Sequence, residues 1–326
     1  MRPGKNLIKA TIFSIFMLVL VLDPQCSLNA ALEGIDLCLK TVIPGMFPLL
    51  FLSSLLAGEL YNNSVPFIEH LLRIPKGTAG FFLVGLVCGY PVGAKLLQNE
   101  IDRKNIGAEN ATRMITFCNN ASPAFIIGIL APIFGNVWYA IILWLIQISG
   151  SIIIGVLLPD RKPKILDQNP IRNKTSATIM TETIKALSTV CGWIIIFGIL
   201  LAYLKAPILN HLSSVPRTIL CGILELTNGM YALQHIYVPF IRFVLASVML
   251  SIGGLCILLQ TKSVAPSINI RKYIYCRLLH ASITATLASI LGIVLFPSDT
   301  VAAYCVPLIF TIFIFSLLIL FFNKKR

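Results

Sequence analysis

The feature that most constrains this chain is the recurrence of apolar stretches about 20 residues long, which short polar segments separate. A helix of about 20 apolar residues crosses a hydrocarbon core of ~30 Å. The stretches are continuous rather than alternating, which favours helices over a barrel. Charged residues make up 12% of the chain, against roughly 25% in soluble domains. The sequence therefore predicts an all-α polytopic membrane protein.

Two kinds of apolar stretch can be distinguished. Eight are uninterrupted enough to be spans, at residues 7–22, 32–57, 113–134, 137–158, 179–203, 236–259, 278–297 and 301–322. The other two, 78–97 and 217–234, each carry a polar, glycine-bearing break at the middle, and each half is too short to cross a bilayer. We interpret these two as re-entrant hairpins.

The net charge of +13 does not indicate a nucleic-acid partner, because the basic residues lie in short loops between spans. In such loops, basic residues determine the membrane topology. With two re-entrant hairpins, the loops 58–77, 98–112, 159–178 and 260–277 share one face with both termini. Basic residues on that face include Arg161, Lys162, Lys164, Arg172, Lys174, Lys262, Arg271, Lys272, Arg277, Lys324, Lys325 and Arg326. The opposite face holds only Lys205 and Arg217. The positive-inside rule therefore predicts a multi-pass cell-membrane protein with both termini in the cytoplasm.

The order of spans and hairpins predicts an inverted repeat, the layout of many secondary transporters. The first repeat covers 32–158 with hairpin 78–97, and the second covers 179–297 with hairpin 217–234. A cytoplasmic loop, 159–178, joins them. Residues 1–31 and 298–326 each add one span. The N-terminus has the basic start and apolar core of a signal peptide but no good small-residue cleavage site, so an uncleaved first span is expected.

Interrupted helices have a physical meaning in a membrane. An unpaired backbone amide or carbonyl costs several kcal/mol in lipid, so broken helices survive only where protein or a water-filled cavity satisfies those groups. The N-terminus of a half-helix favours anions, and unwound carbonyls favour cations. The breaks are therefore the candidate substrate site.

The tip of the first hairpin is the sequence GYPVGAK. Its two glycines permit a tight turn, and Pro91 is suited to begin the second arm. Lys95 lies one turn into that arm, where it is suited to complement a carboxylate. Alternatively, Lys95 snorkels to the interface or pairs with Glu100 or Asp102.

A second break is expected at CNNASP. Asn119 and Asn120 are adjacent amides inside an apolar span, and Ser122 and Pro123 restart a helix as N-cap and first helical residue. Neighbouring amides point to different sides, so one is expected at the site and the other at the hairpin ends. The alternative is that both serve as hydrogen-bonding contacts between helices.

The second hairpin contains an intramembrane acid. Glu225 lies in the sequence GILELTNGMYAL, and such a group is a functional candidate by default. It is suited to bind a coupling cation or a proton, and the alternative is a structural pair with Arg242. The glycines at 253 and 254 either break the following span or serve as a packing site.

Enzyme chemistry is not indicated. The chain lacks H-E-x-x-H, G-x-S-x-G and Walker motifs. Its nine cysteines are single, without C-x-x-C spacing, and its four histidines are isolated. We expect no enzyme, no resident cofactor and no metal.

The segments CGYPVGAKLL, RMITFCNNASPAFIIG and LELTNGMYAL resemble sporulation integral membrane proteins of the YlbJ (SpoVV) type, which carry the nucleoside-recognition or gate domain. The resemblance covers about residues 35–300, and the middle motif is its most specific part. The family is similar in architecture to concentrative nucleoside transporters. The resemblance implies endospore formation in a Gram-positive bacterium, with uptake of dipicolinate (pyridine-2,6-dicarboxylate) across the outer forespore membrane.

The resemblance also implies a set of site residues. The substrate-binding positions are Gly89, Tyr90, Pro91, Gly93, Lys95, Asn119, Asn120, Ser122, Thr227, Asn228 and Gly229, and the motifs also contain Pro123 and Glu225. The Na+ or H+ coupling role of Glu225 rests on its being an intramembrane acid. Tyr90 is suited to stack on an aromatic ring. The expected partners are a small anionic aromatic substrate and the bilayer, not nucleic acid, and a homo-oligomer is compatible with the sequence. A carrier of nucleosides or other small heteroaromatics, or a non-transporting sporulation component, remains an alternative.

Overall fold

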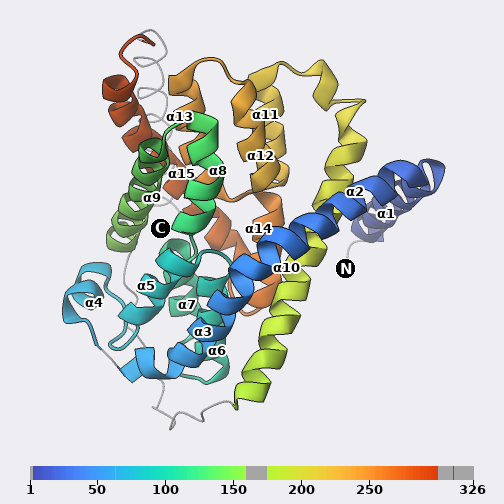
Figure 1. Ribbon diagram of the computed structural model, residues 1–326. Coiled ribbons are helices and arrows are strands. Elements are labelled where there is room, and N and C mark those ends of the chain that lie inside the picture. Colours follow the sequence, from blue (N-terminus) through green and yellow to red (C-terminus); the bar gives the residue numbers. More distant parts are fainter. Residues whose placement is uncertain (1–2, 63, 159–174, 300–310, 312–326) are drawn as a thin grey trace.

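A computed structural model describes residues 3–62, 64–158, 175–299 and 311 (Figure 1). The part of the chain that it describes is helical, without strands, as predicted. The helices of the first half are α1 (Pro3–Leu22), α2 (Pro24–Leu37), the π-helical turn η1 (Cys38–Val42), α3 (Ile43–Asn62), α4 (Pro66–Leu72), α5 (Ala79–Cys88), α6 (Val92–Asp102), α7 (Ala108–Cys118), α8 (Pro123–Phe134) and α9 (Val137–Leu157). Those of the second half are α10 (Ser176–Lys205), η2 (Leu209–His211), α11 (Ser214–Leu224), α12 (Leu226–Ala232), η3 (Leu233–His235), α13 (Pro239–Ile252), α14 (Gly254–Val264) and α15 (Ile270–Leu295).

Six helical segments among the described residues are long and apolar enough to cross a membrane, so the protein is a polytopic membrane protein. They are Pro24–Leu56, Ala108–Phe134, Val137–Leu157, Ser176–Lys205, Pro239–Val264 and Ile270–Leu295. The first predicted span coincides with α1, whose apolar part, Phe13–Leu22, is shorter. All of the predicted span at 301–322 except residue 311, and most of the loop at 159–178, lie outside the described residues. The total of eight spans therefore stays a prediction.

Both predicted hairpin segments fold as two short helices whose arms pack on each other. Arms α5 and α6 flank a break at residues 89–91, and arms α11 and α12 meet at the single residue Glu225. In the second pair, the Thr218 hydroxyl donates to the Ala232 carbonyl oxygen across the arms. Insertion of these units from opposite sides of a bilayer stays a prediction.

The spans that follow each hairpin are both broken. Residues 119–122 separate α7 from α8, as predicted. Gly253, with φ of 80°, separates α13 from α14, and Gly254, with φ of 76°, begins α14. Of the two alternatives for these glycines, the break is formed, and Gly254 also packs against Gly222. Each half of the molecule therefore has the order long segment, paired short helices, broken span and unbroken span.

The two hairpins occupy different ends of the molecule. Figure 1 shows α5, α6 and α7 in the lower half and α11 and α12 in the upper half. An inverted repeat predicts this arrangement. Helices α2 and α10 pack against each other along one side, with α1 outside them (Figure 1).

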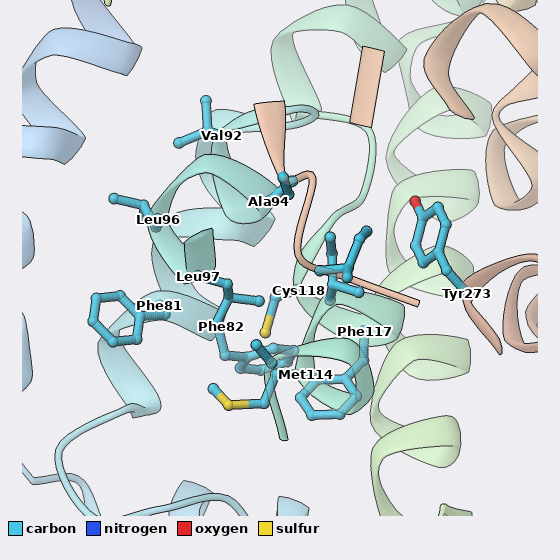
Figure 2. Close-up of a cluster of buried hydrophobic side chains, with 14 of the residues drawn as sticks. Phe81, Phe82, Val92, Ala94, Leu96, Leu97, Met114, Phe117, Cys118 and Tyr273 are labelled. Atoms are coloured by element: carbon cyan, nitrogen blue, oxygen red, sulfur yellow. The ribbon is translucent and has the colours of Figure 1, made fainter. Parts of the chain in front are cut away.

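The core is divided between these two ends. The first hydrophobic cluster surrounds hairpin α5/α6 and α7, and Figure 2 shows the side chains of Phe82, Leu97, Met114 and Phe117 gathered around Cys118. The second cluster joins α8, α9, α12, α13 and α15.

The loop predicted at residues 260–277 is too long at both ends. Helix α14 continues to Val264, and α15 begins at Ile270. Arg277, assigned to this loop with the other cytoplasmic basic residues, lies within α15 and is only 2% exposed. The mistake arises because Arg271 and Lys272, in the first turn of α15, make the helix start resemble a charged loop.

Candidate functional site

The tip of the first hairpin lies directly on the break between α7 and α8. A Cβ atom built at Gly85 would lie 1.9 Å from the Cys118 carbonyl oxygen, and one built at Gly93 would lie 2.3 Å from the same atom. At the tip, Gly89 has φ of 80°, and a Cβ there would lie 2.8 Å from the Ser122 nitrogen. The two glycines predicted to shape the tip, Gly89 and Gly93, therefore also permit backbone contact between the two motifs.

The helix restarts differ in how they are capped. Ser122 is the N-cap of α8, where its hydroxyl oxygen accepts from the Phe125 amide, and Pro123 is the first helical residue, as predicted. Pro91 is the N-cap of α6 rather than its first residue, and no side-chain hydrogen bond caps that helix. Its N-terminus therefore differs from that of α8 in lacking a side-chain acceptor.

The tip of the second hairpin repeats the backbone contact seen at the first. A Cβ atom at Gly254 would lie 2.7 Å from the Gly222 carbonyl oxygen, which places the α13/α14 break against hairpin α11/α12. Gly229 packs on Gly222 within the hairpin, because a Cβ at Gly229 would lie 2.3 Å from the Gly222 Cα atom. Each hairpin thus meets the broken span that follows it.

Glu225 caps its own hairpin arm. One carboxylate oxygen accepts from the Thr227 amide at 3.0 Å, and the other accepts from the amide and the side chain of Asn228, both at 2.8 Å. The side chain therefore occupies the N-terminus of α12, where a substrate anion was expected. The predicted alternative, a pair with Arg242, is not formed: that guanidinium donates to the carbonyl oxygens of Ile236 and Ile133.

Lys95 points toward α10 rather than toward the second hairpin. Its ammonium lies 3.3 Å from a carboxylate oxygen of Glu182. Neither acid proposed as an alternative partner is used, because Glu100 pairs with Arg103 and Asp102 accepts from Gln98. The ion pair joins the first hairpin to α10.

The two asparagines of the α7/α8 break have separate roles. Asn119 donates to the hydroxyl oxygens of Thr261 at 3.1 Å and Tyr273 at 3.0 Å, which links the break to α14 and α15. Asn120 donates to the Phe117 carbonyl oxygen, at the end of α7. Asn120 thus closes the end of α7 rather than a hairpin arm, and the bonds of Asn119 match the alternative of contacts between helices.

Sequence reasoning missed the buried arginine beside these amides. The Arg277 Nη1 atom lies 3.2 Å from the Asn120 side-chain oxygen and 3.4 Å from the His280 Nδ1 atom. Its guanidinium carbon is 5.7 Å from the ring centroids of both Tyr90 and Tyr273. A basic residue seven positions after the start of a long apolar helix is the signal that could have identified it.

Tyr90 connects this cluster to the second broken span. Its hydroxyl donates to the Leu250 carbonyl oxygen at 3.0 Å, and the Gln147 side chain donates to the same oxygen. The structure therefore brings Tyr90, Asn119 and Asn120 together with α13, α14 and α15. Lys95 lies apart from this group, against α10.

Thr227, Asn228 and Gly229 stay with the second hairpin. Asn228 lines a cavity of about 610 Å³ between α2, α10 and the hairpin, together with Glu33, Arg217 and His235. Neither Arg277 nor its four neighbours described above line that cavity. Among the described side chains, no group of three His, Cys, Asp or Glu residues is placed to hold a metal.

Comparison with known proteins adds a relative. The chain is 24% identical over 316 residues to "Sporulation integral membrane protein YlbJ" of Bacillus subtilis (strain 168). The aligned region covers 82% of this chain and 77% of the relative. The chain resembles YlbJ. This similarity confirms the resemblance drawn from the three motifs. No family model matches the chain, and no solved structure matches it.

Proposed function

We propose that this protein is a secondary transporter, and that the two helix breaks and two hairpin tips form its substrate site. The observation that carries the proposal is the meeting of hairpin α5/α6 with the α7/α8 break, and of hairpin α11/α12 with the α13/α14 break. Broken helices are tolerated in a membrane where they line a buried polar site. A protein that only recruits partners has no physical need for such breaks.

The polar groups around the first break support a substrate with negative charge. Arg277 and the two asparagine amides lie within one buried cluster, and a buried cation in a membrane is costly unless something compensates it. Dipicolinate is the proposed substrate, moved into the forespore during sporulation. The support is the similarity to YlbJ, a sporulation membrane protein, together with the cargo that the motif resemblance implies.

The proposed coupling group is Glu225, with Na+ or H+ as the ion. Its carboxylate oxygens accept from three N–H groups of its own helix start. Protonation would weaken that cap, so gain or loss of a proton would change the stability of the hairpin tip. This gives the second hairpin a way to respond to an ion gradient.

The experiment is uptake of radiolabelled dipicolinate into proteoliposomes, with and without Na+ and proton gradients. Saturable uptake above that of protein-free liposomes is expected, with competition by unlabelled dipicolinate. Stronger competition by uridine or adenosine would favour a nucleoside carrier. Absence of saturable uptake for all three compounds, in vesicles where the protein is folded and correctly inserted, would contradict the transporter proposal.

A further inference from the structure

Arg277 differs from Arg113 and Arg242 in what its guanidinium contacts. Arg113 donates to four main-chain carbonyl oxygens, at 2.6 to 3.4 Å. Arg242 donates to the carbonyl oxygens of two residues near helix ends. Arg277 donates to side-chain atoms, those of Asn120 and His280 at 3.2 and 3.4 Å, rather than to main-chain carbonyls, and no carboxylate in the described part of the chain lies within ion-pair distance of it. Its charge is therefore the least compensated of the three.

The unused atoms of Arg277 lie on one edge. Nε and Nη2 have no hydrogen-bond partner among the described groups, although the residue is only 2% exposed. Their N–H bonds run parallel and match the spacing of the two oxygens of a carboxylate, which is the bidentate geometry that arginine uses for such groups. A neutral acceptor would satisfy the hydrogens but leave the charge uncompensated.

The surroundings of the guanidinium are two tyrosine rings and a glycine. The rings of Tyr90 and Tyr273 lie on the guanidinium, each with its centroid 5.7 Å from the central carbon. Gly253 lies beside Nη2. A Cβ atom built on this glycine would be 3.7 Å from the Arg277 Nη2 atom. The break between α13 and α14 thus places backbone without a side chain next to the unused edge.

We propose that Arg277 binds a carboxylate group of the transported substrate through its Nε and Nη2 atoms. This inference rests on the proposed transport function and assigns one residue to substrate binding: Arg277 would hold a carboxylate group, which a neutral nucleoside lacks. Because Arg277 is nearly fully buried, a ligand reaches it only when the hairpin tip bearing Tyr90 and the α13/α14 break separate. Alternating access provides such a movement.

The test measures binding to purified, detergent-solubilised full-length protein, independently of transport. The probes are dipicolinate, picolinate with one carboxylate, and the neutral pyridine-2,6-dicarboxamide. The variants are Arg277→Gln and Arg277→Lys. Arg271→Gln is the matched control, because Arg271 is an exposed arginine in the first turn of the same helix.

We expect both carboxylates to bind the wild-type protein and the diamide to bind at least about tenfold more weakly. Arg277→Gln should weaken dipicolinate binding by roughly 10- to 100-fold, as expected for loss of a charged bidentate contact. Arg277→Lys, which keeps the charge without the fork, should fall between. Arg271→Gln should bind as the wild type does.

Thermal unfolding without ligand separates binding from a structural role. Removing an uncompensated buried charge should leave the melting temperature of Arg277→Gln equal to that of the wild type or higher. A lower melting temperature of Arg277→Gln with unchanged dipicolinate affinity would overturn the inference. It would also be overturned if the wild type bound the diamide as tightly as dipicolinate, or if the wild type bound neither carboxylate. Normal dipicolinate uptake by Arg277→Gln would overturn the inference while leaving the transport proposal intact.

Discussion

At the scale of single residues, glycines determine how closely the broken helices approach one another. Gly85 and Gly93 face the Cys118 carbonyl oxygen at distances that no side chain could occupy. Backbone-to-backbone contact of this kind is typical of helix packing in membranes, where small residues form the interfaces. The polar groups of the breaks are thereby held in place without a layer of side chains between them.

Replacing Gly85 with alanine should be strongly destabilising. The new Cβ would lie 1.9 Å from a backbone oxygen, so the backbone must move, at a cost of about 3 kcal/mol or more. Thermal unfolding in detergent would measure the loss. The control is Gly128→Ala in α8, where nothing lies within 4 Å and alanine should stabilise the helix by roughly 0.5–1 kcal/mol. Equal melting temperatures for the two variants would contradict the packing described.

Glu225 provides a second test at this scale, because its cap and its proposed coupling role make different predictions. Glu225→Ala removes the acceptors for two backbone amides, at a cost of about 0.5–2 kcal/mol in unfolding free energy. Glu225→Gln keeps one acceptor oxygen and should lose less. If the carboxyl group couples transport, uptake by Glu225→Gln should no longer respond to a Na+ gradient or to a proton gradient. If Glu225→Gln kept the ion dependence of the wild type, Glu225 would act as a helix cap and not as the coupling group.

At the scale of helices, the ion pair of Lys95 and Glu182 links the first hairpin to α10. Reversing either charge alone should destabilise this contact, and the double exchange Lys95→Glu with Glu182→Lys should restore it. The expected coupling is about 0.2–1 kcal/mol, because both side chains are partly exposed. A double-mutant cycle of melting temperatures and dipicolinate uptake measures it. The exposed pair of Lys40 and Asp36 is the control, and equal coupling there would show that the hairpin contact has no special role.

The helix breaks were predictable because their chemistry is local. Glycine, proline and paired asparagines interrupt an apolar run whatever surrounds them, so the breaks at residues 89–91 and 119–122 follow from the sequence. The glycines at 253 and 254 fitted either a break or a packing site, and the fold decides between the two. Partners across the fold were not predictable. Lys95 pairs with Glu182, which lies 87 positions away in the sequence. The burial of Arg277 depends on the packing of α15 against both breaks. Contacts of this kind are set by tertiary structure and leave no spacing signal.

At the scale of the whole molecule, the predicted inverted repeat has a consequence for sidedness. If both hairpins return to the face from which they enter, Ala108 lies on the cytoplasmic side and Tyr237 on the opposite side. Both positions are exposed, and Tyr237 is 92% exposed. In a background without native cysteines, Ala108→Cys should react with an impermeant thiol reagent only from inside, and Tyr237→Cys only from outside. Labelling of both from the same side would rule out the predicted topology.

The contact of Gly85 and Gly93 with a single carbonyl oxygen also restricts the length of the chain between them. The eight-residue separation lets both arms touch the Cys118 oxygen. One inserted residue in either arm would rotate that arm by about 100° and turn a side chain toward the oxygen. The hairpin should therefore tolerate neither a side chain at Gly85 or Gly93 nor a change in the length of the chain between them.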